Sequence, residues 1–175
     1  NIGVIADEYP AVDVDLFDSN LADAIVTTTL ALLGPAPMRR SHRPASRLLV
    51  YRTDAPFPKK VLTLPGDQGK IEILGSGRQY LVAGMHPEGT PYSWAKSALW
   101  DVAPDKLRLV TEERIDNLLL VLQEQYGGLI SARGRTRTEH VDRADLIAPS
   151  LQHVVDALAV IPNTDEFLAR AFDVD

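Results

Sequence analysis

The alternation of apolar and polar residues predicts several strands in the first half of the chain. Residues 11–16 alternate strictly, with Asp13 and Asp15 on one side and valines and leucine on the other, which is the period of a strand with one buried face. Further apolar stretches predict strands at residues 2–5, 47–52 and 61–64. We expect the last two to pair antiparallel, because only a proline-bearing loop separates them.

A hairpin and two amphipathic helices complete the predicted pattern. Residues 70–74 and 79–83 are strand-like and flank a glycine-bearing turn, so we expect them to pair as a hairpin. The helices are expected at 19–33 and 111–126, bounded by Ser19 or Asn20, Gly34-Pro35, Thr111 and Gly127-Gly128. Residues 131–140 predict a loop and 151–160 a further helix. This mixture of strands and helices indicates an α/β (α+β) fold.

Length and composition limit the classes of protein that this chain can represent. At 175 residues and 45% hydrophobic content, the chain can bury one sizeable core, so we expect one main domain. The absence of cysteine excludes disulfides and a thiolate zinc site. No apolar run reaches the length of a membrane span, and no signal peptide is recognisable at the start. We therefore expect a soluble, cytoplasmic protein without a membrane partner.

The charge distribution is uneven. The formal net charge of −6 argues against a surface that grips nucleic acid everywhere. One stretch is nevertheless strongly basic and contains Arg39, Arg40, His42, Arg43, Arg47, Arg52, Lys59 and Lys60. Charge alone leaves two interpretations open, a solvated loop and a patch that faces phosphate.

Three carboxylates are the candidates for chemistry. Asp13 and Asp15 are two apart on a predicted strand, so they share a face and can converge on one site. Hard oxygen ligands of this kind suit magnesium or manganese, although an isolated Asp-x-Asp is more often a surface turn. Glu72 interrupts the apolar run 71–74, where an outward-facing position on a half-exposed strand is the plain alternative.

The segment 70–94 carries a resemblance to a known family. It reads KIEILGSGRQYLVAGMHPEGTPYSW: an acidic residue in a strand, a glycine turn, a second strand and a His-Pro-x-Gly-x-x-Tyr-x-Trp exit. This order resembles the bifunctional primase-polymerase domains of phage and plasmid replication proteins, in the archaeo-eukaryotic primase superfamily. The opening Asn1-Ile-Gly-Val, followed by Val12-Asp13-Val14-Asp15, resembles the first motif of that family. The resemblance covers residues 1–110.

The resemblance implies a fold, a reaction and a metal site. The fold would be a primase catalytic core with an antiparallel sheet related to the RNA-recognition fold and flanked by helices. The reaction would be template-directed nucleotidyl transfer from a ribo- or deoxyribonucleoside triphosphate to a 3′-hydroxyl. Asp13, Asp15 and Glu72 would hold two Mg²⁺ or Mn²⁺ ions. The catalytic domain would comprise residues 1–130, and 131–175 would be a loop and helical linker.

The resemblance also assigns substrate contacts. The middle motif of the family ends in a histidine that contacts the triphosphate, whereas this chain has Ala45-Ser46-Arg47, so Arg47 is expected to take that role. The other expected nucleotide-binding residues are Arg78, Gln79, His86 and Lys59, with Lys60 as a further candidate. The expected nucleic-acid-binding residues are Arg39, Arg40 and Arg43. The plain alternatives are a structural turn for His86 and packing anchors for Tyr92 and Trp94.

The expected partners follow from the same resemblance. They are a DNA template and primer, nucleoside triphosphates, and a helicase region that would follow residue 175 in a longer chain. A monomer is expected. Two other functions remain open: a non-catalytic nucleic-acid-binding module of replication initiation, in which Arg47 marks lost catalysis, and a metal-dependent nuclease.

Overall fold

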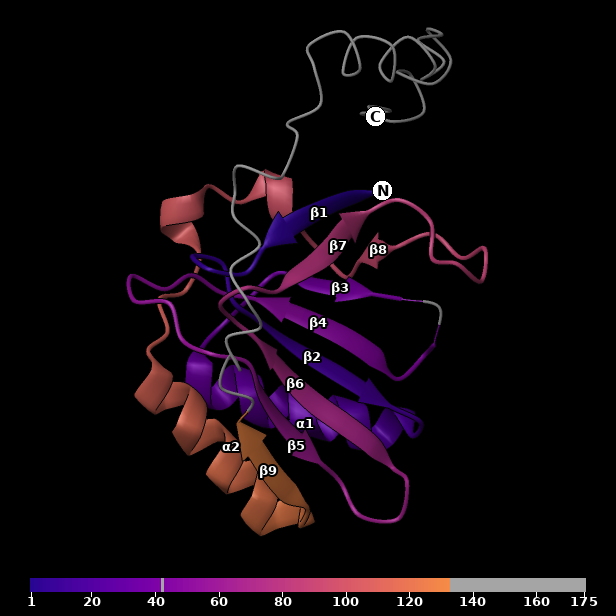
Figure 1. Ribbon diagram of the computed structural model, residues 1–175. Helices are drawn as coiled ribbons and strands as arrows, with labels where there is room; N and C mark the ends of the chain where they lie inside the picture. The colour runs from indigo at the N-terminus through magenta and orange to yellow at the C-terminus, as the bar shows by residue number, and fades with distance from the viewer. Residues whose placement is uncertain (42, 133–175) are drawn as a thin grey trace, which may run out of the picture. The chain divides into compact units, whose positions relative to one another are not determined.

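The computed structural model describes residues 1–41 and 43–132 and has a mixed α+β fold (Figure 1). Its two α-helices are α1 (Ser19–Leu33) and α2 (Glu112–Tyr126), and two short 3-10 helices are η1 (Leu99–Asp101) and η2 (Pro104–Lys106). Its strands are β1 (Ile2–Ile5), β2 (Ala11–Leu16), β3 (Met38–Arg40), β4 (Ser46–Val50), β5 (Lys60–Thr63), β6 (Gly69–Leu74), β7 (Gln79–Ala83), β8 (Ser93–Trp94) and β9 (Leu129–Ala132).

The main sheet has seven strands in the order β8-β3-β4-β2-β6-β5-β9, and every neighbouring pair is antiparallel. The strand β2 lies in the middle, between β4 and β6 (Figure 1). A separate two-stranded antiparallel sheet pairs β1 with β7. The most regular apolar alternation in the sequence therefore marks the central strand.

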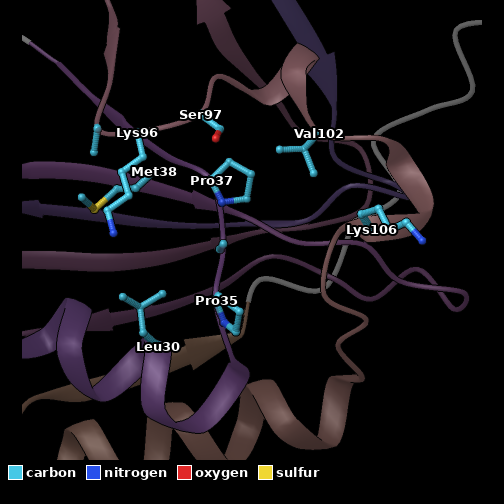
Figure 2. Close-up of a pocket in the computed structure, with 10 residues that line it drawn as sticks. Leu30, Pro35, Pro37, Met38, Lys96, Ser97, Val102 and Lys106 are labelled. Atoms are coloured by element: carbon cyan, nitrogen blue, oxygen red, sulfur yellow. The ribbon is translucent and has the colours of Figure 1, made fainter.

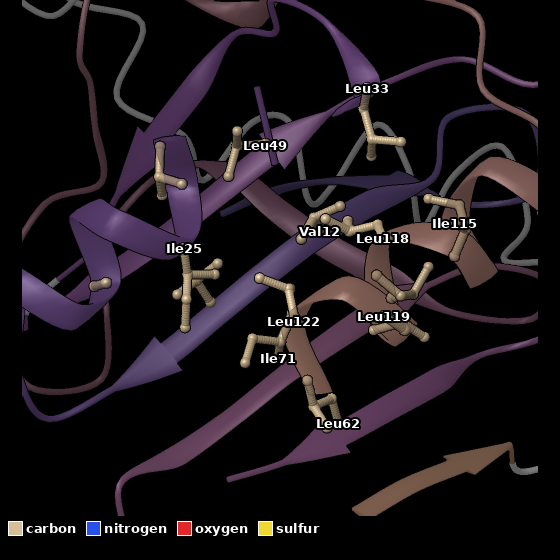
Figure 3. Packing of buried hydrophobic residues seen from close by; sticks show 14 of the residues in the cluster. Val12, Ile25, Leu33, Leu49, Leu62, Ile71, Ile115, Leu118, Leu119 and Leu122 are labelled. Atoms are coloured by element: carbon tan, nitrogen blue, oxygen red, sulfur yellow. The ribbon is translucent and has the colours of Figure 1, made fainter. Parts of the chain in front are cut away.

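Both α-helices cover one face of the main sheet. Val12 and Val14 of β2 are fully buried there, together with Leu49 of β4 and Ile71 of β6. Figure 3 shows Val12, Leu49 and Ile71 packed against Ile25 of α1 and against side chains of α2. The helical side chains in this core cluster are Ala22, Ile25, Val26, Leu33, Ile115, Leu118, Leu119 and Leu122. Burial of this face accounts for the alternation seen in the sequence, because each apolar residue removed from water stabilises the fold.

The helix ends agree with the sequence signals to within one residue. Asp18, rather than Ser19 or Asn20, is the N-cap of α1, and its carboxylate accepts hydrogen bonds from the backbone N–H groups of Asn20 (2.7 Å) and Leu21 (3.1 Å). Asp is a favourable N-cap because its carboxylate oxygen satisfies N–H groups of the first turn that have no partner within the helix. Thr111 caps α2 as predicted. Gly34 and Gly127 are the C-caps that follow the last residues of the two helices.

The other face of the sheet is covered at one end by the β1–β7 sheet. A second core cluster joins Leu48, Val50 and Leu74 of the main sheet to Tyr80 and Val82 of β7. The tyrosine hydroxyl is satisfied there, because it donates to the carbonyl of Tyr9 at 2.9 Å. The polar residues of β2 lie on this same face, beyond the covered end.

The predicted hairpin between residues 70–74 and 79–83 is wrong. Both strands exist, but β6 pairs with β2 and β5, whereas β7 pairs with β1. The turn itself forms, since the N–H of Arg78 donates to the carbonyl of Gly75 (3.1 Å). The edges of β6 are both occupied in the main sheet, so the chain leaves the sheet after the turn and crosses over its face.

One other pairing and the extent of the sheet also differ from expectation. β4 and β5 do not pair with each other, because β2 and β6 lie between them. The short strands β3 and β8 were not predicted, since three and two residues are too few to show alternation. Residues 131–132 belong to β9 rather than to a loop. The rest of the predicted loop and the helix at 151–160 lie outside the described residues.

Candidate active site

The three predicted carboxylates come together on one face of the main sheet. Asp13 at the middle of β2 lies directly opposite Glu72 of β6, and Asp15 lies opposite Lys70. Side chains at directly opposed positions are about 5 Å apart at Cβ. Since Val12 and Val14 face the helices, the alternation of the strand turns Asp13 and Asp15 to the other face. The sequence-based prediction that these carboxylates share a site is consistent with this register.

A glycine allows the approach of β6 to the end of β2. Gly69 opposes Leu16 and has a φ of +113°. A Cβ atom at this position would come within 2.3 Å of the carbonyl oxygen of Asp15. A side chain at position 69 would be strained at this positive φ and would collide with the backbone of Asp15. Glycine therefore allows the close pairing in which Lys70 lies opposite Asp15.

Glu72 is held by two lysines. Its Oε1 is paired with the ammonium of Lys59, and its Oε2 lies 3.0 Å from Nζ of Lys70. The Glu72 side chain is only 13% exposed. Burial raises the pKa of this carboxyl, but the hydrogen bonds and charges of Lys59 and Lys70 outweigh burial and lower the pKa below its ordinary value. Glu72 is therefore ionised at neutral pH and neutralised locally.

Asp13 has the opposite electrostatic character. Its pKa is raised to about 6, chiefly by burial; Arg39 acts against the shift, and the neighbouring charges of Asp15 and Glu72 contribute to it. Among the described residues, Asp13 has neither a hydrogen bond nor an ion pair to its carboxylate. This carboxyl therefore gains or loses its proton close to physiological pH.

Arg39 supplies the nearest buried cation. It lies in the same transverse row of the sheet as Asp13, separated from it by Leu48 of β4. Arg39 is 7% exposed, donates from Nη1 to the carbonyl of Leu81, and holds its guanidinium 4.4 Å from the ring centroid of Tyr92. Within the part of the chain that the structure describes, its Nε has no hydrogen-bond partner. Burial lowers the pKa of Arg39, and Asp13 opposes that shift. The structure thus places Arg39 beside the carboxylates rather than on an exposed basic surface.

Asp15 lies at the outer end of the cluster. Its Oδ1 is 3.3 Å from Nη1 of Arg43, and the same guanidinium lies 5.3 Å from the ring centroid of Phe17. Phe17 is 68% exposed. Sequence reasoning singled out Arg43 for its charge and missed Phe17, although the continued alternation after Asp15 could have placed Phe17 on the same face.

His86 belongs to a structured turn. Its backbone N–H donates to the carbonyl of Thr90 (2.8 Å), and its Nδ1 accepts from the N–H of Glu88 (3.2 Å). The imidazole also meets the ring of Tyr92 edge-on, with centroids 6.0 Å apart. His86 is therefore joined through Tyr92 to Arg39. Trp94 acts as a packing anchor, because its Nε1–H donates to the carbonyl of Val82 (3.1 Å) and its ring packs on the second core cluster.

The expectation that Arg47 lies at the carboxylates does not agree with the structure. Arg47 opposes Val14, so it faces the helices, and its Nη2 pairs with Asp23 of α1 at 2.9 Å. It is 4% exposed and also donates to the carbonyls of Pro44 and Ser46. The position of Arg47 along the chain does not reveal which face of the sheet it occupies, since a shift of one residue in register moves a side chain to the other face.

Four other predicted contacts lie apart from the carboxylates. Lys60 faces α2, where Nζ pairs with Glu112 (2.7 Å) and Asp116 (2.5 Å). Arg40 opposes Arg47, on the face opposite to Arg39. Arg78 lies in the turn beyond the far end of β6, and Gln79 opposes Ile5 in the β1–β7 sheet; both are exposed. His42 lies outside the described residues.

The donor set fits a hard divalent cation only in part. Within the described residues, no group of three Asp, Glu or His side chains is arranged to hold a metal ion. The ion pairs explain this, because Lys59 and Lys70 engage Glu72 and Arg43 engages Asp15. Asp13 and Asp15 present oxygen atoms, which Mg²⁺ and Mn²⁺ prefer.

A pocket of about 560 Å³ lies elsewhere (Figure 2). It is formed between the end of α1, the start of β3 and the segment that follows β8, and none of its lining residues is a carboxylate or a histidine. Its lining residues are Leu30, Pro35, Ala36, Pro37, Met38, Ala95, Lys96, Ser97, Val102 and Lys106. This pocket therefore offers mainly apolar contact, with two lysines but no carboxylate or imidazole in its lining.

The carboxylate face is thus defined by Asp13, Asp15 and Glu72, with Arg39, Arg43, Lys59 and Lys70 around them. No helix in the described part of the chain has the length and apolar character that crossing a membrane requires. Compared with known proteins, the chain matches no family model, no curated protein and no solved structure.

Proposed function

We propose that this chain is a template-directed DNA primase-polymerase domain of the archaeo-eukaryotic primase type. It transfers a nucleotidyl group from a nucleoside triphosphate to a 3′-hydroxyl on a DNA template. The observation that carries the proposal is the placement of Asp13, Asp15 and Glu72 on one face of an antiparallel sheet, with Asp13 and Glu72 directly opposed. Carboxylates so clustered, with cations beside them, suit phosphoryl chemistry.

The chain's own residues perform positioning and charge balance. Asp13 and Asp15 would hold the divalent ions, and Glu72 would join them if the side chain of Lys59 or Lys70 moved its ion pair from Glu72 to a phosphate oxygen. Mg²⁺ or Mn²⁺, when bound, supplies charge stabilisation for the attacking 3′-oxygen and the departing pyrophosphate. Arg39 stays beside Asp13 and favours its ionised form, which a metal ligand requires.

The lysines explain how one face serves both the free and the substrate-bound protein. In the free protein, Lys59 and Lys70 neutralise a carboxylate that is nearly buried. An incoming triphosphate brings several negative charges, which attract the same ammonium groups. The exchange leaves Glu72 free to act as a ligand, so binding of substrate and of metal are coupled.

Incorporation of labelled nucleotides on primed and unprimed DNA templates, with Mg²⁺ or Mn²⁺, tests the proposal. We expect extension by the parent protein and its loss in Asp13→Asn and Glu72→Gln. The matched control is Asp105→Asn, because Asp105 is 73% exposed and pairs only with its neighbour Lys106 among the described residues. Retained extension in both site variants would refute the assignment.

A second function, the non-catalytic nucleic-acid-binding module, is favoured by one observation. Glu72 and Asp15 are already paired with cations, which reduces the repulsion of a phosphate backbone. This function predicts template binding without incorporation, and binding that Asp13→Asn strengthens by removing a negative charge. A nuclease would instead shorten the labelled primer in the same assay.

A further inference from the structure

Phe17 extends the carboxylate face by one position. It follows β2 directly, in a bend, where its N–H donates to the carbonyl of Gln68 at 3.3 Å next to the Leu16–Gly69 pair. The ring lies against the guanidinium of Arg43, which also reaches Asp15, so Phe17 borders the carboxylate face at its Asp15 end.

The ring of Phe17 is exposed and already has one planar partner. It is 68% exposed and is in neither hydrophobic core cluster. An exposed phenylalanine is unremarkable by itself. Here, however, the Arg43 guanidinium lies 5.3 Å from the ring centroid while its Nη1 lies 3.3 Å from Asp15. An aromatic ring and a planar cation thus stand together at the edge of the carboxylate cluster.

We propose that Phe17 and Arg43 form a stacking site for a nucleobase. A base offers a flat π-face, which stacks on an aromatic ring without regard to sequence, and a guanidinium stacks on the same kind of surface. Asp15 fixes the guanidinium beside the ring. The identification of the ligand as a nucleobase rests on the proposed function, since the neighbouring carboxylates are there taken to handle a nucleotide.

The spacing along the strand connects the stacking site with the reaction. Phe17 is two residues beyond Asp15 and four beyond Asp13, or about 7 and 13 Å along an extended strand. A base on Phe17 therefore belongs to the nucleotide whose phosphates lie at the carboxylates, or to the adjoining nucleotide of a strand. Both sources offer the same chemistry, and binding measurements separate them.

The test compares ligands with and without a base. Affinities are measured for dATP and tripolyphosphate in the presence of Mg²⁺, and for a single-stranded oligonucleotide with and without a 3′-terminal abasic site. We expect Phe17→Ala to weaken, by about tenfold, the binding of dATP or of the intact oligonucleotide, and to leave the baseless partner of that pair unchanged. The pair that responds identifies the source of the base. Equal affinities of Phe17→Ala and parent for all four ligands would overturn the proposal.

Two further variants make the test independent of catalysis. Phe17→Trp should bind like the parent and its fluorescence should be quenched by the base-bearing ligand only, after subtraction of the parent signal from Trp94 and Trp100. Leu120→Ala, which removes another exposed apolar side chain on α2, should change no affinity. If the parent incorporates no nucleotide but these base-dependent effects persist, the proposed polymerase function fails and the stacking site stands. If incorporation occurs and the base-dependent effects are absent, the stacking site fails alone.

Discussion

Asp13 and Glu72 are directly opposed on neighbouring strands, yet their pKa values are shifted in opposite directions. Burial raises the pKa of Asp13 to about 6, while Lys59 and Lys70 overcome the burial of Glu72 and lower its pKa. The pair therefore contains one carboxylate that is charged throughout the physiological range and one that responds to pH within it. Perturbed pKa values of this kind cluster at functional sites.

Asp13→Asn should stabilise the metal-free protein at pH 7.5. The pKa of Asp13 is raised from 3.8 to about 6 on folding, so the ionised carboxylate destabilises the folded state above that range. The gain should reach up to about 3 kcal/mol in the free energy of unfolding and should vanish as the pH falls below about 4, where Asp13 is protonated in both states. Urea denaturation in a chelating buffer measures it, and Asp105→Asn should show no such pH-dependent gain.

Binding of Mg²⁺ or Mn²⁺ should weaken as the pH falls below about 6. Asp13 must lose its proton to act as a ligand, so the affinity should drop about tenfold per pH unit in this range. Isothermal titration calorimetry between pH 5 and 8 measures the affinity. The affinity of Asp13→Asn should be lower and independent of pH over the same interval; an unchanged pH slope in that variant would place the titrating ligand elsewhere.

Lys59→Met should destabilise the protein at pH 7 by about 1 kcal/mol, because a nearly buried carboxylate loses one of its two charged partners. The lowered pKa of Glu72 means that its contribution is present above the ordinary value of 4.5 and disappears as the pH falls through the lowered value. The difference between variant and parent should therefore shrink in acid. The same variant should raise the KM for the nucleoside triphosphate, since the ammonium is one that phosphate would recruit.

Arg47→Met should lower the stability of the protein without weakening the binding of nucleotide. Arg47 is buried against α1 and satisfies two backbone carbonyls, so its loss should cost about 1–3 kcal/mol of stability. Because Arg47 faces away from the carboxylates, the KM for nucleotide should stay within about twofold of the parent value. A large rise in the KM for nucleotide at unchanged stability would indicate that Arg47 contacts the substrate.

Sequence reasoning located the carboxylates because they lie on the strand with the clearest alternation. Asp13 and Asp15 were placed on one face by period alone, and the burial of Val12 and Val14 accounts for that success. The pairing of β7 was missed, since the turn after β6 is typical of a hairpin and only the occupied edges of β6 exclude one. The face of Arg47 was missed for a related reason: β4 is buried on both faces, so no alternation marks its register.

The neighbours of the carboxylates were the least accessible to sequence reasoning. Arg39 contacts Tyr92 near the pairing of β3 with β8, and these two strands are too short to show alternation in the sequence. Lys59 immediately precedes β5 and Lys70 lies on β6, so the convergence of both lysines on Glu72 depends on the order of the strands. Long-range pairing, rather than local propensity, decides which charges meet.

The central position of β2 has a consequence for how the site survives thermal fluctuation. This strand is hydrogen-bonded along both edges, to β4 and to β6, from Ala11 through Asp15. The separation of Asp13 from Glu72 can therefore change only when interior ladders break, and edges such as β8 and β9 can fray first. Amide hydrogens at these two positions should exchange with solvent only through global unfolding, so the carboxylate spacing persists for as long as the domain itself.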